Sequence, residues 1–173
     1  MIKYLQPTTV NEKMKLMEFV YKNTNSFILN TFGYVWESRL WWCTQPIQVY
    51  MEGKEIIGLH AFSVNSKAPG TLKTYYIVTH KDHRGKGIAK KLTLAALKDY
   101  KDICNSYFVN SEQFSDGVEF YKKIFNYQYT LTFNEFRTHD FNFEESIESL
   151  LTKWKKENSK QVHKETRTLA NQK

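Results

Sequence analysis

The chain has 173 residues, of which 41% are hydrophobic and 16% aromatic, a composition that suits one domain with a sizeable core. No run of about 18 apolar residues occurs, so no membrane span is expected, and the N-terminal residues do not predict a signal peptide. The formal net charge is +7, and residues 152–173 hold six lysines and one arginine against two glutamates. The two cysteines lie far apart, which indicates a cytoplasmic protein without a disulfide framework, and no metal site is expected.

The N-terminal part of the chain predicts a strand followed by a helix. Residues 2–6 can form an opening strand. Thr9 and Glu12, three residues apart, form a capping box for a helix that continues to about residue 22. Residues 26–43 follow and contain three of the four tryptophans. Core packing and a part in a substrate pocket both remain open for this aromatic segment.

Two apolar runs next predict a β-hairpin. Residues 47–51 and 55–64 are separated by a turn that contains Gly53, a pattern typical of two antiparallel strands. His60 lies in the second run. A lone histidine in a strand is more often a packing residue, but it becomes an acid–base candidate if its side chain reaches a pocket.

The most informative stretch combines a strand, a basic glycine loop and a helix. Residues 75–78 are apolar and predict the strand, and apolar positions spaced by three or four from Ile88 to Tyr100 predict the helix. The first amide N–H groups of a helix have no partner within it, and the helix dipole adds partial positive charge there. Arg84 and Lys86 add cationic donors suited to phosphate, and the two glycines beside them allow close approach to the backbone. The stretch therefore predicts a site for phosphate groups.

Two other kinds of nucleotide site are excluded by the spacing of this loop. A P-loop needs a four-residue spacer and a Gly-Lys-Ser/Thr ending, which are missing. A dinucleotide fingerprint needs three spaced glycines and an acidic residue about 20 positions later, and this pattern is also missing.

The second half of the chain predicts further strands and helices. Residues 103–110 read as a strand, and because it follows a helix we expect it to lie parallel to strand 75–78 with a right-handed crossover. Residues 117–125 favour a helix, and residues 127–137 favour one or two strands. A last helical stripe comprises Phe143, Ile147, Leu150, Leu151 and Trp154. We expect the helix that carries it to dock on the domain or to meet a partner chain.

The pattern Arg84-x-x-Gly87-x-Ala89, with a strand before it and a helix after it, resembles the coenzyme A loop of the GNAT N-acetyltransferase superfamily. Residues 118–124 resemble the second signature of that family, with Tyr121 at the place of its tyrosine. Phe125 and Asn126 depart from that signature, because Gly-Phe is usual there.

The resemblance implies a mixed α/β fold. A GNAT-like sheet would cover residues 1–140. Beyond the family pattern, the sequence itself predicts an added amphipathic helix over residues 141–157 and a flexible basic tail over residues 158–173. Two neighbouring parallel strands would splay apart, and the pantetheine arm of coenzyme A would enter between them.

The resemblance also implies transfer of an acetyl group from acetyl-coenzyme A to a primary amine by direct attack in a ternary complex. Tyr121 would protonate the departing thiolate, unless it is only a packed helical residue. Glu37, His60 and Glu112 are the candidates for the base. The predicted cofactor-binding residues are Ile77, Val78, Thr79, Arg84, Gly85, Lys86, Gly87, Ile88, Ala89 and Asn110.

Two alternative functions remain on the same fold. The basic tail and the aromatic segment 26–43 favour an enzyme that modifies nucleic acid, because bases stack on aromatic rings and a basic tail attracts polyanions. The departures near Tyr121 favour a module that binds coenzyme A without catalysis. The sequence is compatible with a monomer or a homodimer.

Overall fold

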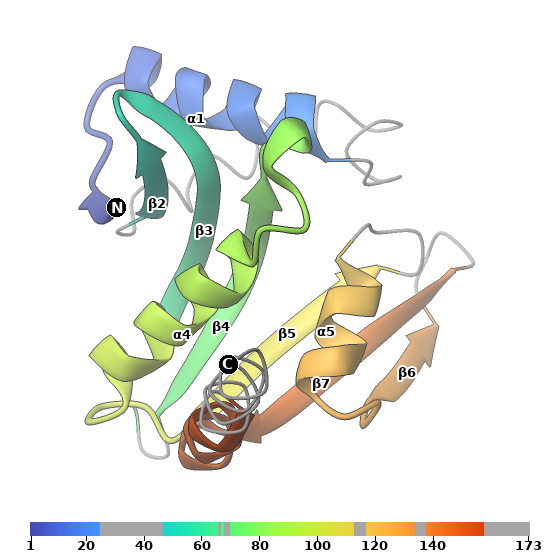
Figure 1. Ribbon diagram of the computed structural model, residues 1–173. Coiled ribbons are helices and arrows are strands. Elements are labelled where there is room, and N and C mark those ends of the chain that lie inside the picture. The colour runs from blue at the N-terminus through green and yellow to red at the C-terminus, as the bar shows by residue number, and fades with distance from the viewer. Residues whose placement is uncertain (25–46, 66, 68–69, 113–116, 134–137, 158–173) are drawn as a thin grey trace, which may run out of the picture.

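One mixed sheet organises the structure, a computed structural model that describes residues 1–24, 47–65, 67, 70–112, 117–133 and 138–157. Seven strands of these residues lie in the order β1-β2-β3-β4-β5-β7-β6, with helices packed on the sheet (Figure 1). The predicted α/β class is confirmed. Glu37, the aromatic segment 26–43 and the basic tail lie outside the described residues. None of the described helices is long and apolar enough to cross a membrane.

Helix α1, Val10–Asn23, begins at the predicted capping box. The Glu12 amide donates to Thr9 Oγ1 at 3.2 Å, and the Thr9 amide donates to Glu12 Oε2 at 3.0 Å. Each side chain therefore satisfies an amide that the first turn leaves without a helical partner.

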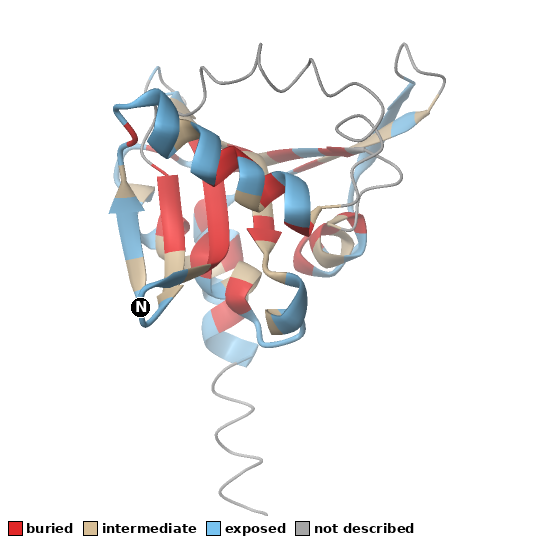
Figure 2. Ribbon diagram, turned by 90° about the horizontal axis from the view of Figure 1, so that it is seen from above, coloured by how far each residue is buried: buried red, intermediate tan, exposed pale blue. Residues whose placement is uncertain are grey.

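The antiparallel half of the sheet contains β1 (Ile2–Leu5), β2 (Ile47–Glu52) and β3 (Glu55–Asn65). The predicted hairpin of β2 and β3 is confirmed, with Ile47 opposite Ala61. Figure 2 shows these two central strands largely buried, because helices cover both of their faces.

Alternation along the strands sorts the side chains between two helices. One face of β2 and β3 contributes Val49 and Leu59 to a core cluster with Met17 of α1. The opposite face carries Gln48 and His60, which lie on the side of the sheet that a second helix covers. Each strand thus has one apolar face and one face that contains buried polar groups.

That second helix, α4 (Ile88–Tyr100), connects two parallel strands, β4 (Thr71–Thr79) and β5 (Ser106–Glu112). The parallel ladder runs only from Thr71 to Thr74, which is opposite Val109. Beyond this pair the two strands diverge in the view of Figure 1, and we call the gap the β4–β5 opening. The expected parallel pair and its splay are therefore present.

The C-terminal half adds α5 (Val118–Ile124), β6 (Thr130–Phe133) and β7 (His139–Ser146). The prediction of a helix from residue 141 is wrong, because the helix begins at residue 147 and Phe143 belongs to β7. Pairing with β5 from Asp140 to Ser146 gives these residues a sheet partner, which outweighs their helical spacing.

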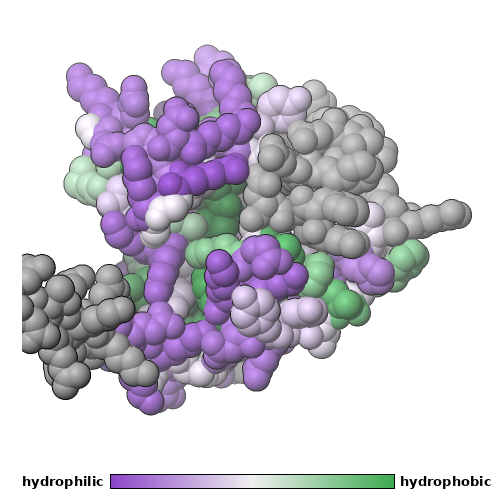
Figure 3. Space-filling view, turned by 45° about the vertical axis from the view of Figure 1, so that its right-hand side comes forward, coloured by the Kyte–Doolittle hydropathy of each residue, from purple (hydrophilic) through white to green (hydrophobic). Residues whose placement is uncertain are grey.

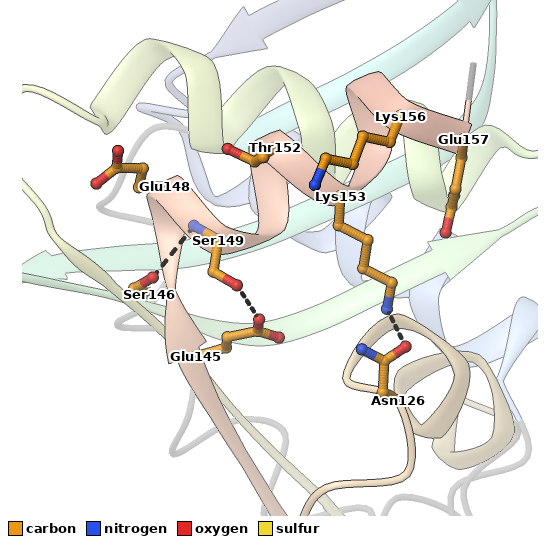
Figure 4. Close-up of a pocket in the computed structure, with 9 residues that line it drawn as sticks. All are labelled: Asn126, Glu145, Ser146, Glu148, Ser149, Thr152, Lys153, Lys156 and Glu157. Carbon is orange, nitrogen blue, oxygen red and sulfur yellow. Dashed lines mark hydrogen bonds between the residues drawn. The ribbon is translucent and has the colours of Figure 1, made fainter. Parts of the chain in front are cut away.

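The terminal helix, residues 147–157, docks on the domain through a buried face. Leu150 is fully buried and Trp154 is 2% exposed, in one core cluster with Ile124 of α5. Lys153 Nζ donates to Ile124 O and to Asn126 Oδ1, both at 2.6 Å, at the C-terminal end of α5 (Figure 4). A shallow polar cavity of about 650 Å³ lies beside this contact.

Replacement of Trp154 by alanine should lower the free energy of unfolding by about 3–5 kcal/mol, because it removes a large side chain from a closed core. Lys156→Ala, an exposed change on the same helix, should alter it by less than about 0.5 kcal/mol. Urea unfolding of the three proteins measures both differences. Equal stability of Trp154→Ala and wild type would show that the helix does not dock in solution.

Candidate active site

A cavity of about 560 Å³ lies at the β4–β5 opening, between the end of β4, the start of α4 and the side of α5. This volume falls in the range of small-molecule sites. Figure 3 shows hydrophobic side chains in a recess between two groups of hydrophilic ones. Eight of the ten predicted cofactor-binding residues line the cavity: Ile77, Val78, Thr79, Arg84, Gly85, Gly87, Ile88 and Ala89.

The other two predicted cofactor-binding residues lie elsewhere. Lys86 does not line the cavity, and its Nζ is 3.4 Å from His83 Nδ1. Asn110 lies on β5 with its side chain turned to β7, where its Nδ2 donates to Asn142 Oδ1 at 2.8 Å. Neither side chain lines the cavity.

The loop before α4 adopts a backbone that only glycine accepts readily. Gly85 has φ +77° and Gly87 has φ +72°, and a Cβ on either would meet no atom within 4 Å. Gly87 is also the N-cap of α4 and supplies no capping side chain, so the first-turn amides of the helix are left to a ligand. The open space in front of the glycines and the helix N-terminus suit phosphate groups.

Asn23, the last residue of α1, holds this loop in place. The Arg84 guanidinium donates to Asn23 O at 2.7 Å, and the Lys81 amide donates to Asn23 Oδ1 at 3.0 Å. Asn23 is 6% exposed, and both Asn23 and Thr24 line the cavity. Sequence patterns do not reveal this role of Asn23, because no local pattern links α1 to a loop some 60 residues later.

The electrostatics of the cavity favour an anion. Among the described lining residues, Arg84, Lys90 and Lys123 carry positive charge, and Glu157 is the carboxylate. The N-terminal dipole of α4 adds partial positive charge in the same place.

His60, a predicted candidate for the base, is fully buried away from this cavity. Its Nδ1 is 3.2 Å from Gln48 Oε1 and its Nε2 is 2.8 Å from Thr74 Oγ1, so both ring nitrogens are engaged. Thr74 Oγ1 in turn is 2.8 Å from the Tyr107 hydroxyl. Burial lowers the pKa of His60 from 6.5 to about 3, which keeps the ring neutral. This geometry does not support His60 as the base.

Tyr121, the predicted acid, projects from α5 into the core and is not among the residues that line the cavity. Its side chain is 4% exposed, and its ring centroid is 5.8 Å from that of Phe143. Burial and the nearby Tyr107 hydroxyl raise the pKa of Tyr121 well above its usual range. The phenol therefore stays protonated, and the same shift makes it a weaker acid.

Glu112 and Glu37 are the other two predicted candidates for the base. Glu112 is the last residue of β5, and its backbone is opposite Asp140 of β7. Glu37 lies outside the described residues. Both stay predictions.

Comparison with known proteins places the chain beside acetyltransferases. The model of the acetyltransferase (GNAT) family matches residues 18–127, well over half of the chain. No curated protein sequence matches it significantly.

Solved structures of low sequence identity share the fold. An aminoglycoside 6′-N-acetyltransferase complexed with coenzyme A has TM-score 0.61 and 11% identity over 85% of this chain and 97% of that one. PaiA N-acetyltransferase from Thermoplasma acidophilum, in complex with coenzyme A, has TM-score 0.58 and 15% identity over 84% and 99% of the two chains. An IAA acetyltransferase from Bacillus cereus has TM-score 0.61 and 13% identity over 84% and 98%.

The burial of His60 predicts a pH dependence of stability. The unfolded chain protonates this histidine below about pH 6.5, whereas the folded protein does so only near its pKa of about 3. The folded state thus binds fewer protons in this window, and stability falls as the pH falls. For His60 alone, the free energy of unfolding should drop by about 2–3 kcal/mol from pH 7 to pH 4.5.

Urea unfolding across this pH range tests the prediction. His60→Gln should lack this component and show a smaller slope than wild type. His139→Gln, at an exposed position on β7, should keep the wild-type slope. Identical slopes for wild type and His60→Gln would contradict the assignment of a buried, neutral ring.

Proposed function

The chain belongs to the GNAT family of acetyltransferases, and we propose that it transfers an acetyl group from acetyl-coenzyme A to a primary amine. The observation that carries this proposal is the convergence of the Arg84–Ala89 loop and the end of β4 on one cavity at the β4–β5 opening. The solved relatives that contain coenzyme A share this fold and support the choice of donor.

In this proposal the loop holds the pyrophosphate of the donor. The first-turn amides of α4 and the Arg84 guanidinium would donate to its oxygens. The pantetheine arm would lie in the β4–β5 opening, along Ile77, Val78 and Thr79. These residues pair with β3 on one side, whereas the ladder with β5 ends at Thr74, so amide groups of the arm are suited to pair with the β5-facing edge of the strand.

The chemical step is direct attack in a ternary complex. The amine first loses a proton to a base or to water, with Glu37 and Glu112 as the candidate bases. Its nitrogen then attacks the thioester carbonyl carbon, and a backbone N–H near Val78 or Thr79 stabilises the oxyanion. The carbon–sulfur bond breaks as the sulfur takes a proton from Tyr121, the former amine nitrogen gives up its second proton, which restores the phenol, and the products are an amide and free coenzyme A. Positioning both substrates in one site supplies much of the rate.

Steady-state assay of thiol release from acetyl-coenzyme A, across a panel of primary amines, tests the proposal. We expect amine-dependent turnover by the wild type. Tyr121→Phe should lower kcat by about a hundredfold with little change in KM for acetyl-coenzyme A, because only the proton donor is lost.

Tyr127→Phe is the matched control, because it removes the hydroxyl of an exposed tyrosine just after α5. It should leave kcat unchanged. A loss of less than threefold in Tyr121→Phe would show that Tyr121 is a packing residue. Absence of turnover with every amine would count against the proposed reaction itself.

A further inference from the structure

The terminal helix reaches the cavity through one residue, Glu157, although the helix lies beyond residues 18–127, where the family model matches. Glu157, near the end of this helix, lines the cavity together with Lys90 from the first turn of α4. The Lys90 ammonium is 2.8 Å from Glu157 Oε2 and 5.5 Å from the centre of the Trp154 ring. An ion pair therefore links the terminal helix to α4, the helix whose N-terminus faces the cavity.

The Glu157 carboxylate is unexpected in a cavity whose other charged lining groups are cationic and suit phosphates. It repels an anionic ligand, and it neutralises a lysine that would otherwise attract one. The side chains of Lys90 and Glu157 are 41% and 46% exposed, so water weakens their attraction, and exchange of partners costs little.

The position of Glu157 is fixed by the packing of its helix. Trp154, one turn earlier, is buried in the core. Lys153 donates to Ile124 O at the end of α5 and to Asn126 Oδ1 (Figure 4). The carboxylate can turn its side chain away from Lys90, but the helix cannot leave the cavity without unpacking the core.

We propose that Lys90 binds a phosphate group of the ligand and that Glu157 occupies this lysine while the cavity is empty, so that Glu157 sets the affinity of the site. On binding, a phosphate replaces the carboxylate as the partner of Lys90, and Glu157 turns to solvent. This inference rests on the proposed function, since it takes a phosphate-bearing acyl donor as the ligand.

Calorimetric titration of the full chain with coenzyme A tests the exchange. Glu157→Gln keeps the size of the side chain and removes its charge, so it should bind coenzyme A about threefold more tightly than wild type. Glu148→Gln is the matched control, because it makes the same charge change on the same helix but does not line this cavity. Its affinity should equal that of wild type.

The Lys90→Gln background separates exchange from simple repulsion. Lys90→Gln alone should weaken binding, and in that background the gain from Glu157→Gln should fall by at least half. An undiminished gain would mean that Glu157 only repels the ligand and would overturn the exchange. Equal affinities of Glu157→Gln and Glu148→Gln for coenzyme A would also overturn the exchange, but they would leave the proposed function unaffected. If the wild type binds no coenzyme A, the proposed function and this inference both fall.

Discussion

The cavity depends on where β4 stops pairing with β5, and a hydrogen-bonded row of three side chains, His60, Thr74 and Tyr107, lies at that place. Thr74 is the last residue of β4 that pairs with β5, and its hydroxyl is 2.8 Å from both His60 Nε2 and the Tyr107 hydroxyl. Inside a core such groups are costly unless each is satisfied, so they specify which side chains meet across β3, β4 and β5. The hydrogen bonds among these three side chains thereby fix where the parallel ladder ends and where the β4–β5 opening begins.

Close packing against β3 sets the position of helix α4 on the sheet. A Cβ on Gly58 of β3 would lie 2.5 Å from Ile88 Cγ2, so only glycine lets the first turn of α4 come this near to the strand. The amides of that turn then face the β4–β5 opening, and Asn23 holds the loop in front of them from the other side. Strand, loop and helix N-terminus are positioned by different contacts, which together define one anion site.

Features encoded within a few residues were predictable from the sequence. The Thr9–Glu12 capping box, the hairpin and the Arg84-x-x-Gly87-x-Ala89 loop each depend on near neighbours, and the structure has them where the patterns indicated. Residues 141–146 were misassigned to a helix because Phe143 fits a helical stripe, and only pairing with β5 decides for a strand. Asn23 and Glu157 were missed because their partners are remote in sequence.

Amide NMR titration with coenzyme A tests the central claim, that the β4–β5 opening and the loop before α4 form the donor site. We predict the largest shift changes at Val78, Thr79 and residues 85–89, and their loss in Gly87→Asp, which places a carboxylate where phosphate would bind. Shift changes confined to the polar cavity near Lys156, or no changes in these residues at saturating ligand, would contradict the account.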